Sequence, residues 1–217
     1  GPLVCIANHP FGVLDGLIMG YLLSLRRGKD FKIFAHGVFQ HTEDVGAYIL
    51  PVMFDEDAET VRKNLSVRRE ALDYLNDGGA IGIFPSGQVA TSLKPFGDAI
   101  DRQWGVYTGR LVMRSRATVV PIYFAGQNSR LFQLMARVND LVRVGLLLRE
   151  LAKSYKGGVD LVIGKPVERE EIEKREQNPK LLMEYLRRCT YSLATPPLDD
   201  LSYGWDFDKA YGKGRNT

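Results

Sequence analysis

The stretch PLVCIANHPFGVLDGLIMGYLLSL, residues 2–25, places a polar loop between two apolar segments. The first segment, PLVCIA, is a continuous apolar run, which is typical of a strand buried on both faces of a sheet. The second, LDGLIMGYLLSL, is typical of a buried helix. The loop between them contains His9 and Asp15. These two residues are consistent either with a polar helix cap or with the chemistry of an enzyme.

The same alternation of strand and helix recurs along the chain. Apolar runs bounded by turn residues predict strands at residues 3–7, 31–35, 48–54, 80–84, 118–124 and 159–163. Helical patterns lie at residues 14–27, 59–76, 106–116, 130–154 and 179–193. This order predicts an α/β fold in which a mainly parallel sheet is flanked by helices. Since no linker or repeat interrupts it, we expect a single domain over residues 1–217.

The composition is that of an ordinary globular domain, with 45% hydrophobic and 25% charged residues. A net charge of only +3 does not indicate a nucleic-acid partner. Cys5 and Cys189 fit no disulfide or metal framework, and Cys5 is expected to be a buried thiol in a reducing compartment.

No apolar run reaches the roughly 18 residues that span a bilayer. Because the chain starts almost at a buried strand, we expect further residues before Gly1 in the natural protein, which could carry a membrane anchor.

Four polar loops that contain glycine follow predicted strands. They are NHPFGVLDG, HGVFQHTEDVG, PSGQVATS and AGQNSRLF. In open α/β sheets, binding sites lie beyond the carboxyl ends of the strands. We therefore expect these loops to converge on one site.

In the first loop, His9 is a candidate general base, and Asp15 could fix its tautomer and stabilise the imidazolium that forms. Asn8 could brace the loop, and Gly12 could let the backbone approach a ligand. The alternative is that Asp15 caps the helix and His9 is an ordinary surface residue. A metal site would need a further ligand such as His36, His41 or Glu43. The spacing matches no standard zinc pattern, so we expect no metal.

The loop FPSGQVATS, which follows the predicted strand at residues 80–84, contains a tight turn at Pro85 and Gly87. Backbone amides near Gly87 and Gln88, helped by Ser86, could hold an oxyanion, although an ordinary turn would have the same composition. Ser86 invites comparison with the serine of a G-x-S-x-G nucleophile elbow. The residue two positions before it is a phenylalanine rather than a glycine, which disfavours a serine hydrolase.

Taken together, NHPFGVLD, FPSGQVATS, VVPIYF and VIGKPV resemble, in this order, the motifs of the glycerolipid and lysophospholipid acyltransferase family. That family includes the 1-acylglycerol-3-phosphate acyltransferases, and the match covers residues 3 to about 167. The chain departs from the family pattern in three ways. Five residues rather than four separate His9 from Asp15, Ser86 replaces a glutamate, and Val89 stands where arginine is common. Since basic residues hold the acceptor phosphate in the family, these departures put a glycerol phosphate acceptor in doubt.

The variant HPFGVLDG, with PIYFAGQNSRLF and the Trp104-Gly105 pair, is similar to a hemolysin-like bacterial branch that includes lyso-ornithine lipid O-acyltransferases. The resemblance implies an αβ sandwich that moves a fatty acyl group from an acyl thioester to the hydroxyl of a lyso-lipid, with a lyso-aminolipid favoured over lysophosphatidic acid.

The resemblance also implies residue roles. His9 is the general base, oriented by Asp15, and Ser86, Gly87 and Gln88 bind the oxyanion or the acceptor. Gln127, Asn128 and Ser129 fall on the acceptor side, although they could equally cap the helix predicted at residues 130–154. No cofactor is implied beyond the co-substrate, which is an acyl carrier protein or coenzyme A thioester.

Both substrates carry acyl chains, so the resemblance implies a peripheral protein at the cytoplasmic face of a bacterial inner membrane, in contact with lipid or with an acyl carrier protein. Residues 110–156 hold nine arginines and lysines against Asp140 and Glu150. Within them, residues 131–154 could form a helix that lies in the interface of an anionic membrane. The alternative is a core-facing amphipathic helix, whose basic face could also dock an acidic carrier protein.

Two alternative functions remain open. One is a serine hydrolase of the lipase or thioesterase type, in which Ser86 would be labelled by a serine-directed phosphonate. The other is a non-catalytic lipid-binding or membrane-lytic module, in which loss of His9 would change no activity.

Overall fold

The computed structural model describes residues 1–53, 58–92, 97–135, 145–147, 149–152, 157–198 and 201. One six-stranded sheet forms its centre, with the strand order β3-β2-β4-β1-β5-β6. The strands are β1 (Leu3–Ala7), β2 (Lys32–His36), β3 (Ile49–Val52), β4 (Ala80–Ile83), β5 (Thr118–Phe124) and β6 (Leu161–Ile163). All pairs are parallel except β5 with β6, which is antiparallel. The predicted α/β fold with a mainly parallel sheet is confirmed.

The strand bounds differ from the predicted ones mainly at the edges of the sheet. β3 ends at Val52 rather than at residue 54, which lies outside the described residues. β6 begins at Leu161 rather than at residue 159, because it pairs only with the last three residues of β5. The central strands β1 and β5 have the predicted bounds. Edge strands have neighbours on one side only, so their ends are less strongly determined by the apolar pattern.

The helices α1 (Val13–Arg27), α2 (Ala58–Asn76), α3 (Val106–Ser115) and α7 (Pro179–Tyr191) lie where the sequence predicts them. Of the helix expected at residues 130–154, α4 covers Arg130–Met135, and residues 145–147 and 149–152 are also helical. The rest of that prediction, residues 136–144, 148, 153 and 154, lies outside the described residues. The sequence did not predict α6 (Arg169–Glu173) or the 3-10 turns η1 (Gly37–His41) and η2 (Gly46–Tyr48), because such short elements have no measurable periodicity.

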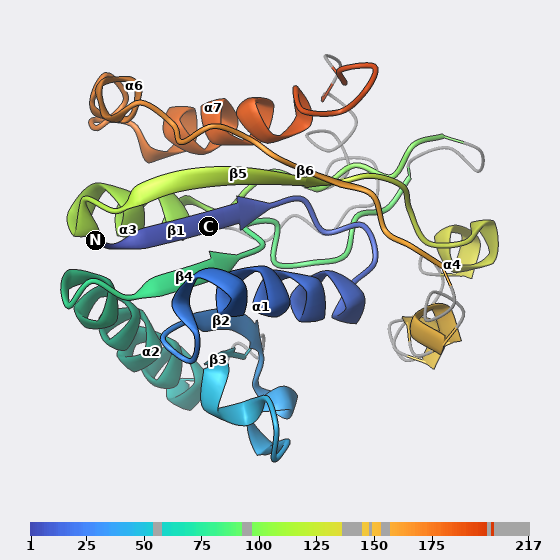
Figure 1. Ribbon diagram of the computed structural model, residues 1–217, viewed down its shortest axis with the longest axis horizontal. Helices are drawn as coiled ribbons and strands as arrows, with labels where there is room; N and C mark the ends of the chain where they lie inside the picture. Colours follow the sequence, from blue (N-terminus) through green and yellow to red (C-terminus); the bar gives the residue numbers. More distant parts are fainter. Residues whose placement is uncertain are drawn as a thin grey trace.

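Helices cover both faces of the sheet (Figure 1). The residues of β1 alternate between the two sides. Val4 and Ile6 of β1 belong to a core cluster that includes residues of α2, α3 and α7. Cys5 and Ala7 belong to a second cluster, with Met19 and Leu23 of α1. Apolar residues at every strand position are therefore required, as expected for a sheet buried on both faces.

The packing of α1 places the start of this helix at the carboxyl end of β1. A Cβ atom on Gly82 of β4 would lie 2.6 Å from Met19 Cγ, so glycine at this position lets α1 lie close against the sheet. In Figure 1, β1, β4 and β5 point the same way, and the loops that follow them, with α4, lie on that side. The polar loops expected to converge therefore share one edge of the sheet.

Among the described residues, no helix has both the length and the apolar character needed to cross a membrane.

The contact between α1 and the sheet predicts different effects for two apolar residues on the same helix. Met19 is fully buried against Gly82, whereas the side chain of Leu17 is 49% exposed. We expect Met19→Ala to lower the free energy of unfolding by about 2–5 kcal/mol, because it leaves a cavity in the core. Leu17→Ala, the matched control, should change it by about 0.5 kcal/mol or less. Equal effects of the two variants in urea denaturation would contradict this packing.

Candidate active site

His9 and Asp15 are in direct contact at the carboxyl end of β1. His9 Nδ1 lies 3.0 Å from Asp15 Oδ2. The Asp15 side chain is completely buried, whereas that of His9 is 18% exposed. Because the carboxylate accepts the Nδ1 proton, the neutral ring carries its lone pair on Nε2. Nε2 forms no hydrogen bond with any residue that the structure describes, so the partly exposed ring can accept a proton from a bound molecule.

Asp15 also shapes the loop that carries His9. Its Oδ2 atom accepts hydrogen bonds from the backbone N–H groups of Phe11, at 2.8 Å, and of Gly12, at 2.9 Å. Gly12 is the N-cap of α1 and Asp15 is its third residue, as in a capping box. The two interpretations of Asp15 are therefore not exclusive, since one carboxylate both caps the helix and contacts the histidine.

The His9 ring stacks on Phe84, with the ring centroids 4.2 Å apart. The His9 backbone is held on both sides of the residue. Its N–H donates to Asp101 Oδ1 at 3.1 Å, and its carbonyl accepts from the N–H of Ala90 at 2.7 Å. Segments that follow β4 thus hold both the ring and the backbone of a residue that follows β1.

Asp101 is a charged residue of this site that the sequence reasoning missed. It is completely buried, and its Oδ2 atom accepts a hydrogen bond from Trp104 Nε1 at 2.9 Å. Burial raises the pKa of Asp101 to about 6, although its hydrogen bonds with Trp104 and with the His9 backbone act in the opposite direction. The nearby Trp104-Gly105 pair contributed to the family resemblance, but no motif pointed to the aspartate three residues before Trp104.

Asn8 joins the ends of two neighbouring strands. Its Nδ2 group donates to the Phe124 carbonyl at 2.9 Å, and its Oδ1 atom accepts from the Phe124 N–H at 2.7 Å. The side chain thus extends the pairing of β1 with β5 by one more residue. It holds the loop after β1 against the last residue of β5.

Gly12 has a backbone φ of 78°, a region that favours glycine. A Cβ atom there would lie 2.9 Å from Leu147 and 3.1 Å from Val89. The close approach at this residue is therefore to two apolar side chains, one from the loop after β4 and one from the helical residues after α4.

In the turn after β4, two of the groups that the sequence suggested as oxyanion donors form hydrogen bonds within the turn instead. Gly87, with φ of 66°, donates its N–H to the Phe84 carbonyl at 3.0 Å. The Ser86 hydroxyl donates to the Gln88 carbonyl at 2.8 Å. Within the described part of the chain, the N–H of Gln88 has no acceptor and Ser86 forms no hydrogen bond with His9. Of these groups, the Gln88 amide is the one that no hydrogen bond within the turn uses.

The residues after β5 make mostly structural contacts. Gln127 Oε1 accepts from the N–H of Ala99 at 2.7 Å. Ser129 donates through its N–H and its hydroxyl to the buried carboxylate of Glu150, and its Oγ atom also accepts from the N–H of Phe132 in the first turn of α4. Asn128 is buried, and its Nδ2 group has no hydrogen-bond partner among the described residues. These contacts match the helix-cap interpretation for Ser129 and leave Asn128 with an unused donor.

His36 is the last residue of β2 and the N-cap of η1, and His41 is the last residue of η1; both are exposed. Among the described residues, no three His, Cys, Asp or Glu side chains are grouped so that they could hold a metal ion.

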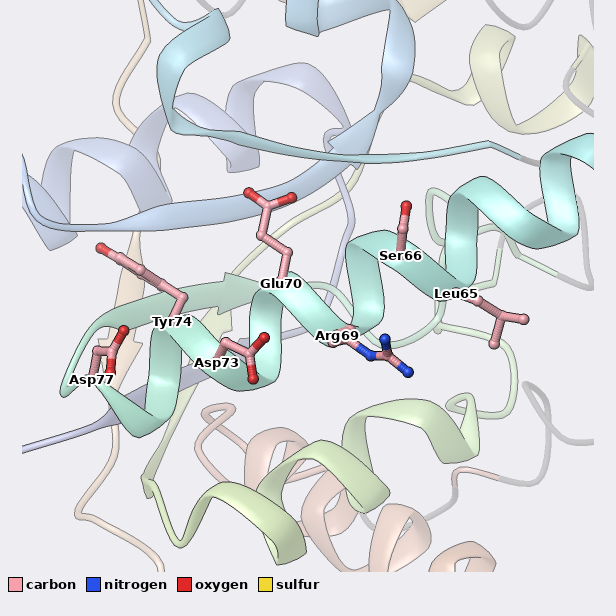
Figure 2. Close-up of a pocket in the computed structure, with 7 residues that line it drawn as sticks. All are labelled: Leu65, Ser66, Arg69, Glu70, Asp73, Tyr74 and Asp77. Carbon is pink, nitrogen blue, oxygen red and sulfur yellow. The ribbon is translucent and has the colours of Figure 1, made fainter.

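One open depression on the described surface lies away from these loops. Figure 2 shows the seven residues that line it, all of which belong to α2 or directly follow it. It is open and has a volume of about 630 Å³. None of its residues belongs to the loops that hold His9, so it does not form part of the candidate site.

Comparison with known proteins identifies the family of this chain. Residues 1–125, more than half of the chain, match the model of the family described as Acyltransferase. The chain is 22% identical over 203 residues to a lyso-glycine lipid O-acyltransferase of Phocaeicola vulgatus, and the match covers 89% of this chain and 68% of that protein. It is also 22% identical over 195 residues to a lyso-glycine lipid O-acyltransferase of Bacteroides thetaiotaomicron, covering 87% of this chain and 68% of that protein.

The family match includes β1, the His9 and Asp15 loop, the turn after β4 and all of β5. The resemblance that the four sequence motifs indicated is therefore confirmed at the level of the family. The chain belongs to the acyltransferase family, and it is an enzyme that transfers acyl groups.

Proposed function

We propose that this enzyme moves a fatty acyl group from an acyl thioester to the hydroxyl of a lyso-lipid, with His9 as general base. The observation that carries the proposal is the contact between His9 Nδ1 and the buried Asp15 carboxylate, which leaves Nε2 of a partly exposed ring without a partner among the described residues. The names of the two relatives, both lyso-glycine lipid O-acyltransferases, support a lyso-lipid acceptor.

In the proposed reaction, Nε2 of His9 removes the proton of the acceptor hydroxyl as its oxygen attacks the thioester carbonyl. Asp15 stabilises the imidazolium that results. The tetrahedral oxyanion accepts a hydrogen bond from the N–H of Gln88. The carbon–sulfur bond then breaks, the new ester forms, and the thiolate takes the proton from His9. Because a thiolate is a good leaving group, neither a metal ion nor an acyl-enzyme is required.

The proposed acceptor is a lyso-aminolipid, in which the hydroxyl belongs to an N-acylated amino acid. Two observations favour it over lysophosphatidic acid. Val89 and Ser86 stand where the wider family has charged residues, and the relatives are named for a glycine lipid. The donor is an acyl carrier protein or coenzyme A thioester, and both belong in the test.

We also propose that the enzyme works at a membrane surface, since its acceptor and product are both lipids; for the bacterial branch it resembles, this is the cytoplasmic face of the inner membrane. Most of the amphipathic segment 131–154 lies outside the described residues. Among the exposed apolar residues are Leu17 on α1 and Leu131 on α4.

The reaction is tested by supplying the purified protein with lyso-glycine lipid, lyso-ornithine lipid and lysophosphatidic acid, each with acyl carrier protein and coenzyme A thioesters. We expect an O-acylated aminolipid and one equivalent of thiol, both detected by mass spectrometry. Acylation of lysophosphatidic acid alone would contradict the aminolipid acceptor. Release of free fatty acid without acylated product would contradict acyl transfer.

His9→Ala should lower kcat by about 10²–10⁴, the usual contribution of a general base. His41→Ala is the matched control, because His41 is exposed and lies at the end of η1. We expect it to retain wild-type kcat. A folded His9→Ala protein with near-normal turnover would support the non-catalytic alternative and exclude His9 as the base.

Ser86→Ala separates acyl transfer from serine hydrolysis. Because the Ser86 hydroxyl donates to the Gln88 carbonyl rather than to His9, we expect this variant to keep kcat within about tenfold of wild type. We also expect no labelling of the wild-type protein at Ser86 by a phosphonate. Covalent labelling, together with complete loss of activity in Ser86→Ala, would instead indicate a hydrolase-like mechanism.

A further inference from the structure

Asp101 has a position that the proposed reaction does not use. Its carboxylate is completely buried, and both of its oxygens are engaged within the protein, Oδ1 by the His9 N–H and Oδ2 by Trp104. A substrate therefore does not contact it. It is joined to the proposed base by the hydrogen bond of 3.1 Å to the His9 backbone.

The backbone of Asp101 is itself held by α7. Its N–H donates to the Tyr191 hydroxyl at 2.7 Å, and its carbonyl accepts from Arg187 at 2.8 Å. Tyr191 and Arg187 are each 1% exposed, and α7 packs on the same sheet face as Val4 and Ile6 of β1. Asp101 thus connects a helix on one face of the sheet with the loop that carries His9.

An ionised aspartate is energetically unfavourable at this buried position. Burial raises the pKa of Asp101 to about 6, which means that the fold disfavours the charged form that is present at neutral pH. A neutral residue of similar size would fill the space at a lower cost to stability. A carboxylate offers two acceptors, one for the indole and one for the His9 amide.

We propose that Asp101 is a positioning residue for the acyl transfer, which holds the His9 backbone so that Nε2 keeps its alignment with the acceptor hydroxyl. His9 then has two carboxylates with separate tasks. Asp15 orients the ring through Nδ1, and Asp101 holds the main chain from which the ring projects. Small displacements of a general base reduce turnover strongly, because the proton transfer needs a short and aligned contact.

A matched pair of variants isolates the hydrogen bond to His9. Trp104→Phe serves as the background, because it removes the indole donor that would face a neutral side chain at position 101. In this background, Asp101→Asn keeps an oxygen that can accept the His9 N–H, whereas Asp101→Leu has similar size and no acceptor. Both variants lack the negative charge of Asp101. They differ in whether position 101 offers an acceptor to the His9 N–H.

We expect the Asn variant to keep kcat within about threefold of Trp104→Phe, and the Leu variant to lose roughly 10- to 100-fold, with KM for both substrates unchanged. In a His9→Ala background, the difference between the Asn and Leu variants should disappear, because there is no longer a base to position. If Asp101→Leu does not fold, Asp101→Ala in the same background removes the acceptor with a smaller side chain.

Three outcomes would overturn the proposal: equal kcat for the Asn and Leu variants, a difference that lies in KM, or a difference that persists without His9. The proposal rests on His9 being the general base, which His9→Ala tests separately. Normal turnover in His9→Ala refutes the proposed function. Equal turnover of the matched pair, in an enzyme that needs His9, refutes only the role of Asp101.

Discussion

The structure depends on the buried carboxylate of Asp15. Its Oδ2 atom accepts three hydrogen bonds, from His9 Nδ1 and from the N–H groups of Phe11 and Gly12. A buried carboxylate is stable only when such donors satisfy it. The three bonds to Oδ2 therefore determine where α1 begins, how the loop turns, and which nitrogen of His9 can take a proton. The Asp15 carboxylate thus sets both the conformation of the loop and the orientation of the His9 ring.

The sheet supplies the second constraint. In a parallel sheet, the loops after neighbouring strands lie at one edge, and β1 has β4 and β5 on its two sides. Asn8 ties the loop after β1 to β5, while Ala90, Phe84 and Asp101 tie it to the segment after β4. His9 is held from both sides, so it projects from a rigid support rather than from a mobile loop. Such a support suits the proposed role of His9, since a fixed base needs little reorganisation as charge develops.

Much of this arrangement can be predicted from local pattern. Continuous apolar runs such as VCIA indicate strands buried on both faces, and α1 follows from a long apolar segment that starts just after a polar loop. The family follows from four short motifs in order. The hydrogen bonds within the turn after β4 cannot be predicted from these patterns. Gly87 and Ser86 belong to one polar turn, yet the Gly87 amide and the Ser86 hydroxyl are both turned back onto neighbouring carbonyls, while the Gln88 amide is not.

The sequence by itself determined the α/β class, the strand–loop–helix unit that contains His9 and Asp15, and the membership of a family, because each depends on residues close together in the chain. The tertiary structure alone decided that Asp101 reaches the His9 backbone. They are 92 positions apart in the chain, and α7 holds Asp101 through Tyr191 and Arg187. Such a contact has no periodicity and no motif. It exists because side chains from β1, the loop after β4 and α7 must all satisfy their polar groups in the same buried space.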